Sequence, residues 1–384
     1  MLVHKQKRIL LFSYEFPPLG GGVANATKNL LEEFAKSEEV KIDLITSSLR
    51  DTYESERISE NIGIYKVPIG RKSESYYQKQ NPSNMLLYVK NSYLQATDLL
   101  KHKKYDLAHF FGYPGAWQGL LLKKKFDLPY LISLRGVDVP FYNPRFELID
   151  YLYRPLVKHL WNEAEKVIVN SHGLLDLAKK TNPDLKYKII TNGVNADFFD
   201  FGDEKGKYKK FTVTAGATIM GAKKGLNFLI EAFAKFAKDK KDVELLLIGD
   251  GDLKESLEMM VSELALDKKV KFLGRKDKNW LKENLPKCHA FCLPSLNEGM
   301  SNATLEAMAC GLPIIITPVG GSKELLGGNG FLVAQADPEA IAERLDLLYK
   351  DKELRISMAK ESRKRAIGMS WQKVAEEYLR SYGN

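Results

Sequence analysis

The sequence predicts an α/β protein made of two doubly wound lobes with parallel sheets. Short apolar or β-branched runs alternate with helical patterns from end to end, and most of these runs lack the polar alternation of half-exposed strands. Strands that are apolar on both faces are typical of parallel sheets covered by helices on both sides. The pattern restarts after a polar stretch near residue 200, and 384 residues are enough for two lobes that each bury a core.

The first lobe is expected to begin with a strand and to alternate strands with helices. Its expected strands cover residues 8–13, 41–46, 107–111, 130–134, 166–170 and 188–191, with a helix over 23–36. The turn dipeptide Asn192-Gly193 follows the last strand, and residues 200–210 are polar and without apolar period. We therefore expect a first lobe over residues 1–200 and an interdomain linker over 201–210.

The second lobe is expected over residues 211–366. Its strands are predicted at 211–215, 243–249, 270–273, 290–293 and 313–317, and its helices at 226–238, 253–264 and 303–310. Ligands of such sheets bind beyond the carboxyl ends of the strands, so the site is expected in a cleft between two facing lobes.

Composition and charge narrow the classes of function. The net charge of +9 is spread over both halves, which argues against a nucleic-acid platform and suits anionic small substrates or an anionic membrane surface. The three cysteines, Cys288, Cys292 and Cys310, stand in apolar settings without metal-ligand spacing, as small buried residues of a reducing cytoplasm do. No run approaches the ~18 apolar residues of a membrane span. A cytoplasmic protein is predicted, with peripheral membrane contact through residues 71–79 or 123–125 as the alternative to a solvated basic face.

The first candidate site is the loop FPPLGGGVANA, residues 16–26, which leads from the first strand into the first helix. Its three consecutive glycines remove every Cβ from the approach to the helix N-terminus, which makes an anion cradle, unless the loop is only a tight turn with positive φ. The third glycine of the dinucleotide fingerprint would fall on Asn25, so an NAD dehydrogenase is disfavoured.

The richest candidate stretch runs from Pro294 to Gly321. Glu298 and Glu306 stand eight residues apart across a loop-to-helix junction. The amides between them are those of Gly299, Met300, Ser301 and Asn302. Amides at a helix N-terminus suit sugar hydroxyls or a phosphate, and Glu306 can accept two hydrogen bonds from a vicinal diol such as ribose. The alternative is an ordinary helix cap with solvated glutamates.

Two further motifs follow strands of the second lobe. Lys223 and Lys224 precede an expected helix, where an ammonium could reach a diphosphate, although two exposed lysines are commonplace there. Asp250 and Asp252 have the spacing of metal-dependent sugar transferases, but a turn followed by a helix N-cap accounts for them better. No metal site is expected.

Candidate side chains of the first lobe lie at expected strand ends. His109 is placed at the end of one strand and Asp138 just past the next, so both would point into the cleft. The alternatives are a buried structural histidine and a simple pairing of Arg135 with Asp138.

Together these motifs resemble the retaining family-4 glycosyltransferases, which have the GT-B fold, over nearly the whole chain. The resemblance is carried by PPLGGGVANATKNL, IITNGVNADFF, KKGLNFLIEAF, LLLIGDGD, VKFLG and, most specifically, EGMSNATLEAMACGLPIIITPVGG with Glu298 and Glu306. Residues 370–379 are similar to the family's C-terminal helix, which crosses back to the first lobe, so residues 367–384 are expected to pack there.

The resemblance implies transfer of a sugar from a nucleoside diphosphate donor, with UDP favoured and GDP as the alternative, and with retention at the anomeric carbon. The acceptor would be a hydroxyl of a glycan or lipid-linked molecule in bacterial polysaccharide or envelope synthesis, and no cofactor or metal would be obligatory. Glu298, Lys224 and His109 would be catalytic, while Arg135 and Asp138 would contact the acceptor. The implied donor contacts are Gly21, Gly22, Thr218, Lys223, Lys224, Arg275, Glu298, Gly299, Met300, Ser301, Asn302 and Glu306.

The sequence departs from the family pattern twice. Ala217-Thr218 stands where the family usually has a Gly-Arg pair, and the stretch 106–111 keeps only the first histidine of an H-x-H motif. These departures leave a non-catalytic sugar-nucleotide-binding protein as one alternative. A sugar-nucleotide epimerase on the same two-lobed fold is the other.

Overall fold

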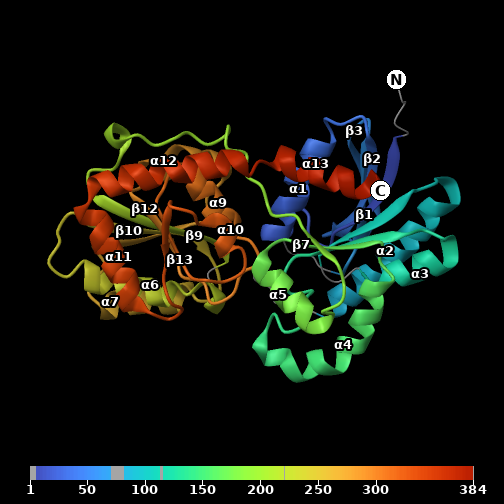
Figure 1. Cartoon of the computed structure of the whole chain (residues 1–384), viewed down its shortest axis with the longest axis horizontal. Helices are drawn as coiled ribbons and strands as arrows, with labels where there is room; N and C mark the ends of the chain where they lie inside the picture. The colour runs from blue at the N-terminus through green and yellow to red at the C-terminus, as the bar shows by residue number, and fades with distance from the viewer. Residues whose placement is uncertain (1–5, 71–81, 113–115, 220, 384) are drawn as a thin grey trace. The chain divides into compact units, whose positions relative to one another are not determined.

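The computed structural model describes residues 6–70, 82–112, 116–219 and 221–383 (Figure 1). The chain divides into two compact units, Met1–Asn192 with Trp371–Asn384, and Gly193–Ser370. The chain passes from one unit to the other between residues 192 and 193 and again between 370 and 371. The sequence suggested that the first lobe ends at residue 200 and the second at residue 366. Each unit contains one sheet with helices on both faces, which is the two-lobed α/β architecture that the sequence predicts.

The first unit contains an eight-stranded sheet in the order β3-β4-β2-β1-β5-β6-β7-β8. Its strands are β1 Lys7–Phe12, β2 Val40–Ser48, β3 Glu54–Ser59, β4 Ile62–Pro68, β5 Leu107–Phe111, β6 Tyr130–Leu134, β7 Lys166–Val169 and β8 Tyr187–Ile189. Neighbouring strands pair in parallel except β3, which is antiparallel to β4. The sequence did not reveal β3, because ESERIS is polar and has no buried residue, as suits an edge strand, and it did not reveal the more buried β4 either.

Helices cover both faces of this sheet. They are α1 Gly22–Phe34, α2 Pro82–His102, α3 Trp117–Phe126, α4 Glu147–Asn162, α5 His172–Thr181 and α13 Trp371–Gly383, with a short 3₁₀ turn η1 at Pro144–Phe146. Successive residues of β1 alternate between two cores: Ile9 and Leu11 join one, and Leu10 and Phe12 join the other. This is the two-sided burial expected of a parallel strand.

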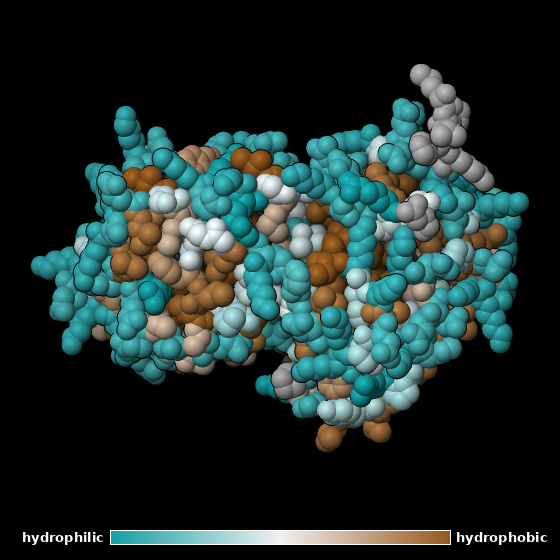
Figure 2. Space-filling view, in the orientation of Figure 1, coloured by the Kyte–Doolittle hydropathy of each residue, from teal (hydrophilic) through white to brown (hydrophobic). Residues whose placement is uncertain are grey.

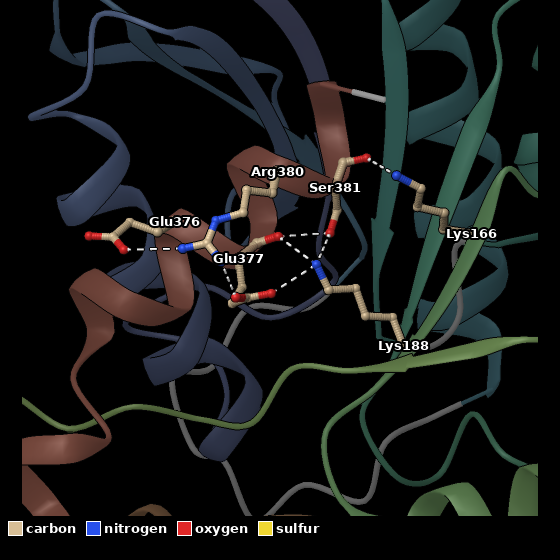
Figure 3. A network of polar contacts seen from close by, with 6 residues as sticks. All are labelled: Lys166, Lys188, Glu376, Glu377, Arg380 and Ser381. Carbon is tan, nitrogen blue, oxygen red and sulfur yellow. Dashed lines mark hydrogen bonds and ion pairs between the residues drawn. The ribbon is translucent and has the colours of Figure 1, made fainter.

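The C-terminal helix α13 belongs to the first unit, as the resemblance implied. Trp371, Tyr378 and Tyr382 enter the core that also holds Ile9 and Leu11. Polar contacts fix the outer side of the helix (Figure 3): Lys188 Nζ lies 2.9 Å from Glu377 Oε2, and Lys166 Nζ donates to the Ser381 carbonyl at 3.0 Å. The ammonium of Lys188 lowers the pKa of the Glu377 carboxyl.

The second unit contains a six-stranded parallel sheet in the order β11-β10-β9-β12-β13-β14. Its strands are β9 Phe211–Ile219, β10 Val243–Asp250, β11 Val270–Gly274, β12 Ala290–Leu293, β13 Ile314–Ile316 and β14 Gly330–Leu332. Its helices are α6 Leu226–Phe236, α7 Lys254–Glu263, α8 Lys278–Asn284, α9 Asn302–Ala309, α10 Ser322–Leu325, α11 Pro338–Lys350 and α12 Lys352–Gly368, with 3₁₀ turns η2 Glu204–Gly206, η3 Ala222–Lys224 and η4 Leu285–Lys287.

The expected linker over residues 201–210 packs on the second unit. The Gly202 amide donates to the Cys310 carbonyl at 3.2 Å, and the Tyr208 amide donates to the Lys287 carbonyl at 2.9 Å. A Cβ on Gly202 would lie 2.0 Å from the Pro286 carbonyl oxygen, so the stretch runs close against η4. The polar composition of this segment therefore marks a surface strap of the second unit.

Cys288, Cys292 and Cys310 are buried free thiols, and burial raises the pKa of Cys288 to about 12. Among the helices of the described ranges, none has the length and apolar character needed to cross a membrane.

Candidate functional site

The candidate site of the second unit is organised around the N-terminus of α9. The loop 294–301 connects the end of β12 to this helix, and Ser301 is its N-cap, with Oγ accepting from the Thr304 amide at 3.2 Å. The helix cap that the sequence offered as an alternative is therefore present. It coexists with the amide-rich helix start, where the helix dipole favours a bound anion or hydroxyl oxygen.

The loop before α9 contacts the turn that carries the predicted diphosphate lysine. Lys224, in η3 after β9, places its Nζ 2.5 Å from Glu298 Oε1, and the same oxygen accepts from Ser295 Oγ at 3.1 Å. The side chains of Lys224 and Glu298 are 25% and 16% exposed. The Leu296 amide also donates to the Lys223 carbonyl at 2.7 Å, while the Lys223 side chain is exposed. The structure thus brings two predicted site residues from separate loops into direct contact.

Glycines allow this close approach. Gly225 has φ of +63°, and a Cβ there would lie 2.1 Å from the Pro294 carbonyl oxygen. Gly320, with φ of +50°, passes under the Glu298 carbonyl, where a Cβ would lie 2.3 Å from the oxygen. Both loops depend on backbone positions that a side chain would obstruct.

The second glutamate of the motif pairs with a residue that sequence reasoning missed. Glu306, in the second turn of α9, forms an ion pair with Lys278 at the start of α8, and its side chain is 13% exposed. Lys278 gave no signal because it stands 28 residues from its partner in a polar helix start. Arg275, expected near the base, is exposed just after β11.

The remaining predicted donor contacts differ in their burial and in the element on which they lie. Met300 points its side chain into the core, where its sulfur lies 2.1 Å from an ideal Cβ on Gly321, so only its backbone remains a candidate contact. Gly299 is buried in the same loop, and Asn302 is the first residue of α9. Thr218 lies in β9, but its side chain falls outside the described part of the structure.

The glycine loop of the first unit contacts a carboxylate of the protein itself. The Gly21 amide, at the N-cap of α1, donates to the Glu15 carboxylate at 3.1 Å, and α1 begins at Gly22. A Cβ on Gly20, which has φ of +103°, would lie 2.6 Å from this carboxylate. The positive-φ turn predicted as the alternative is therefore present, and the Gly21 amide predicted to face an anion contacts the protein's own Glu15.

His109 lies inside the sheet, which corrects the expectation that it ends its strand. The strand β5 continues to Phe111, and the ring is fully buried. Its Nδ1 lies 2.8 Å from Tyr382 Oη and its Nε2 2.7 Å from Ser133 Oγ. Burial lowers the pKa of His109 to about 3. This position matches the structural alternative and leaves no ring nitrogen for a substrate.

Arg135 and Asp138 are joined through the backbone. The Asp138 carboxylate accepts from the amides of Arg135 at 2.9 Å and Gly136 at 2.7 Å, and burial raises the pKa of Asp138. The Arg135 guanidinium is buried, donates to Asn192 and stacks 4.4 Å from the Phe111 ring centroid. Arg135 and Asp138 therefore do pair, as the alternative interpretation had it. The pairing runs from the backbone amide of Arg135 to the carboxylate of Asp138 and stabilises the turn.

Asp250 is the last residue of β10, and Asp252 lies in the turn that follows. The Gly251 amide donates to Asp250 Oδ1 at 2.9 Å, but α7 begins later, at Lys254 with Leu253 as N-cap. The expected N-cap role of Asp252 is therefore wrong. Within the described ranges, no group of three or more His, Cys, Asp or Glu is arranged to hold a metal ion.

A cavity of about 20 Å³ is lined partly by the loop that carries Glu298, with Ser301, Thr304 and Thr317 also among its lining residues. That volume suits one water molecule. A sugar nucleotide is far larger, so a donor would have to bind outside this cavity.

Two family matches together span residues 20–365. Residues 20–198 match Glycosyltransferase Family 4, and residues 197–365 match Glycosyl transferases group 1. The chain belongs to this family of glycosyltransferases, and it is an enzyme of the glycosyl-transferring class.

Individual relatives agree with this membership. An uncharacterized glycosyltransferase of Methanocaldococcus jannaschii is 27% identical over 95% of each chain. The structure resembles sucrose-phosphate synthase from Thermosynechococcus elongatus, with a TM-score of 0.83, 20% identity and 98% of each chain covered. It also resembles Anabaena HepE, solved in complex with UDP-glucose, with a TM-score of 0.74, 18% identity and coverage of 97% of this chain and 98% of that one. The fold is therefore GT-B, as expected.

Proposed function

We propose that this protein transfers a sugar from a UDP-sugar to a hydroxyl group of a glycan or lipid-linked acceptor, with retention of the anomeric configuration. The observation that carries the proposal is the contact of Lys224 with Glu298 beside the N-terminus of α9, the helix that also holds Glu306. A cation, a helix dipole and a carboxylate facing a diol are the groups that a diphosphate and a ribose require. The UDP-glucose complex of Anabaena HepE supports uridine as the base.

In the proposed complex each residue has a separate task. The ammonium of Lys224 and the amides of Gly299 to Asn302 stabilise the diphosphate, while Glu298 accepts hydrogen bonds from sugar hydroxyls. Glu306 accepts hydrogen bonds from the two ribose hydroxyls in place of its present ion pair with Lys278.

The proposed chemical step is a displacement on one face of the sugar. The bond between the anomeric carbon and the diphosphate oxygen breaks, and the acceptor oxygen forms a new bond to that carbon from the same side. The acceptor proton passes to the departing β-phosphate oxygen. The protein then acts through electrostatic stabilisation of the diphosphate and of an oxocarbenium-like sugar, where one contact is worth ~3 kcal/mol.

UDP release tests the proposal. The protein is incubated with a panel of UDP-sugars, with and without glycan and polyprenyl-diphosphate acceptors, and the product is examined by NMR for the configuration of its new bond. The expected result is UDP release and a product whose new linkage has the same anomeric configuration as the sugar had in the donor.

Two other results would overturn the proposed reaction. A new sugar nucleotide formed from donor alone would identify an epimerase. Tight donor binding without UDP release in the presence of every acceptor would identify a non-catalytic binding protein.

A further inference from the structure

The Glu298 carboxylate makes both of its polar contacts through one oxygen. Lys224 Nζ lies 2.5 Å from Oε1, and Ser295 Oγ donates to Oε1 at 3.1 Å. Within the part of the chain that the structure describes, the other oxygen, Oε2, takes part in no hydrogen bond or ion pair. A carboxylate can accept about four hydrogen bonds, two on each oxygen. Oε2 therefore keeps its full capacity to accept hydrogen bonds from a ligand.

The two donors to Oε1 differ in how firmly they are placed. Lys224 has a long, flexible side chain that is 25% exposed, whereas Ser295 is short and 1% exposed. In the proposed function, the ammonium of Lys224 stabilises the donor diphosphate, so it does not serve the carboxylate alone. The buried hydroxyl of Ser295 has no such second task. It is thus the donor suited to hold Oε1 while the ammonium contacts the diphosphate.

The backbone of Ser295 is tied to the sheet of the second unit. The strands β12 and β13 are parallel neighbours, and Ser295 and Thr317 follow these strands at the same edge of the sheet. Thr317 Oγ1 donates to the Ser295 carbonyl at 2.5 Å, and the Ser295 amide donates to the Leu293 carbonyl at 3.0 Å. The hydroxyl that contacts Glu298 is therefore placed by the sheet, which is more precise than placement by a free loop.

The Ser295 hydroxyl serves neither solubility nor close packing. Much of the surface in view in Figure 2 is hydrophilic, but Ser295 is 1% exposed and adds almost nothing to it. Burying a hydroxyl costs free energy unless the group is hydrogen-bonded, and this one is bonded to Glu298. Both residues line the cavity of about 20 Å³, so packing leaves space beside the carboxylate. A hydrogen bond therefore holds the carboxylate where packing does not.

We propose that Ser295 is a positioning residue for Glu298, a role that rests on the proposed function. Its hydroxyl holds Oε1 in place and leaves Oε2 to accept a hydrogen bond from a hydroxyl group of the donor sugar. Lys224 is then free to contact the diphosphate without loss of the orientation of the carboxylate. Ser295 itself touches no substrate, so its effect on the reaction passes through Glu298.

Comparison of UDP with a UDP-sugar tests this role in the full chain. The donor is the UDP-sugar of the panel that gives the fastest UDP release. Ser295→Ala should lower kcat/KM for this donor about tenfold or more, mainly through kcat, because a hydrogen bond that orients Glu298 in the transition state is lost. The affinity for UDP, measured by titration calorimetry, should be unchanged, because UDP carries no donor sugar for Glu298 to bind.

Two further variants separate positioning from packing. Ser295→Cys nearly keeps the size of the side chain but replaces the hydroxyl with a weak donor, so it should lose as much kcat/KM as Ser295→Ala. Ser322→Ala is the matched control, because Ser322 lines the same cavity and is 4% exposed, and its hydroxyl is not bonded to Glu298. It should turn over the donor like the wild type. Urea unfolding of each variant shows that it folds.

Three results would overturn the role of Ser295 while the proposed function stands. The first is a wild-type kcat/KM for Ser295→Ala. The second is a wild-type kcat/KM for Ser295→Cys, which would show that only the size of the side chain matters. The third is a fall in UDP affinity as large as the fall in kcat/KM, which would show that the whole loop is disturbed. If the wild type releases no UDP from any donor, the proposed function fails and the role of Ser295 fails with it.

Discussion

Lys224 Nζ and Glu298 Oε1, 2.5 Å apart, join the loop after β9 to the loop after β12. In the proposed reaction the negative charge on the departing diphosphate grows in the transition state, so the ammonium contributes most at that point. We expect Lys224→Met to lower kcat about hundredfold. Steady-state UDP release measures this change.

The matched control for that prediction is Lys235→Met. Lys235 forms an ion pair with Glu339 at 2.6 Å on the exposed surface of the same unit. Its loss should leave kcat unchanged. If Lys224→Met and Lys235→Met have the same kcat, Lys224 does not stabilise the transition state.

Glu306 should affect donor binding more than turnover. Its carboxylate is proposed to accept two hydrogen bonds from ribose, and hydrogen bonds to a charged group contribute about 1.5–3 kcal/mol each. Glu306→Ala is therefore expected to raise the KM for the donor tenfold or more with little change in kcat. A fall in kcat at unchanged KM would contradict a ribose contact.

Lys278 is expected to compete with the donor for Glu306. The two form an ion pair in which the lysine side chain is 46% exposed, and ion pairs exposed to solvent contribute about 1 kcal/mol or less. Lys278→Met should thus strengthen UDP binding by up to about fivefold, as measured by titration calorimetry. The neighbouring Lys276→Met is the control, and weaker UDP binding by Lys278→Met would show that Lys278 itself holds the nucleotide.

Gly225 should tolerate a side chain poorly. An alanine Cβ there would lie 2.1 Å from the Pro294 carbonyl oxygen, a rigid backbone atom, and φ is +63°. Gly274 has nearly the same φ, +66°, but its Cβ would meet nothing within 4 Å. Gly274→Ala should cost only the strain of positive φ, about 1 kcal/mol, and Gly225→Ala should cost more and displace Lys224. Equal losses of stability in urea unfolding would contradict the steric argument.

The sequence predicted those parts of the fold whose secondary structure depends on a local pattern, such as an apolar run or a helix cap. The strands β6 and β12 have their predicted bounds because each is a continuous apolar run between polar residues. The predicted helix over 303–310 starts within one residue of α9, whose N-cap is Ser301. The polar edge strand β3 and the strap over 201–210 carry no apolar period, so the same rule missed them.

The parts that could not be predicted depend on long-range contacts. Glu306 meets Lys278 from another helix, and Gly21 meets Glu15 across a loop whose bend no propensity reveals. Periodicity also assigns the apolar face of an amphipathic helix to the core. In α4 that assignment holds for Trp161 but fails for Leu148, because only packing decides which apolar face is covered.

The buried His109 should make the first unit sensitive to acid. Its folded pKa is about 3, lowered mainly by burial and further by the charge of Arg135, against about 6.5 in an unfolded chain. The unfolded chain thus binds the proton first. The stability contributed by the neutral ring is complete above about pH 6.5 and is lost as the pH falls toward 3, at up to about 1.4 kcal/mol per pH unit.

Substituting His109 should remove this pH dependence from the first unit. His289 of the second unit, whose pKa burial lowers to about 4, retains a similar slope of its own. We expect urea unfolding of wild type between pH 7 and pH 5 to show a larger loss of stability than that of His109→Gln. The exposed His102→Gln is the control and should follow the wild type. If His109→Gln loses as much stability over this range as the wild type does, the ring is already charged or exposed in the folded protein, and its structural assignment is wrong.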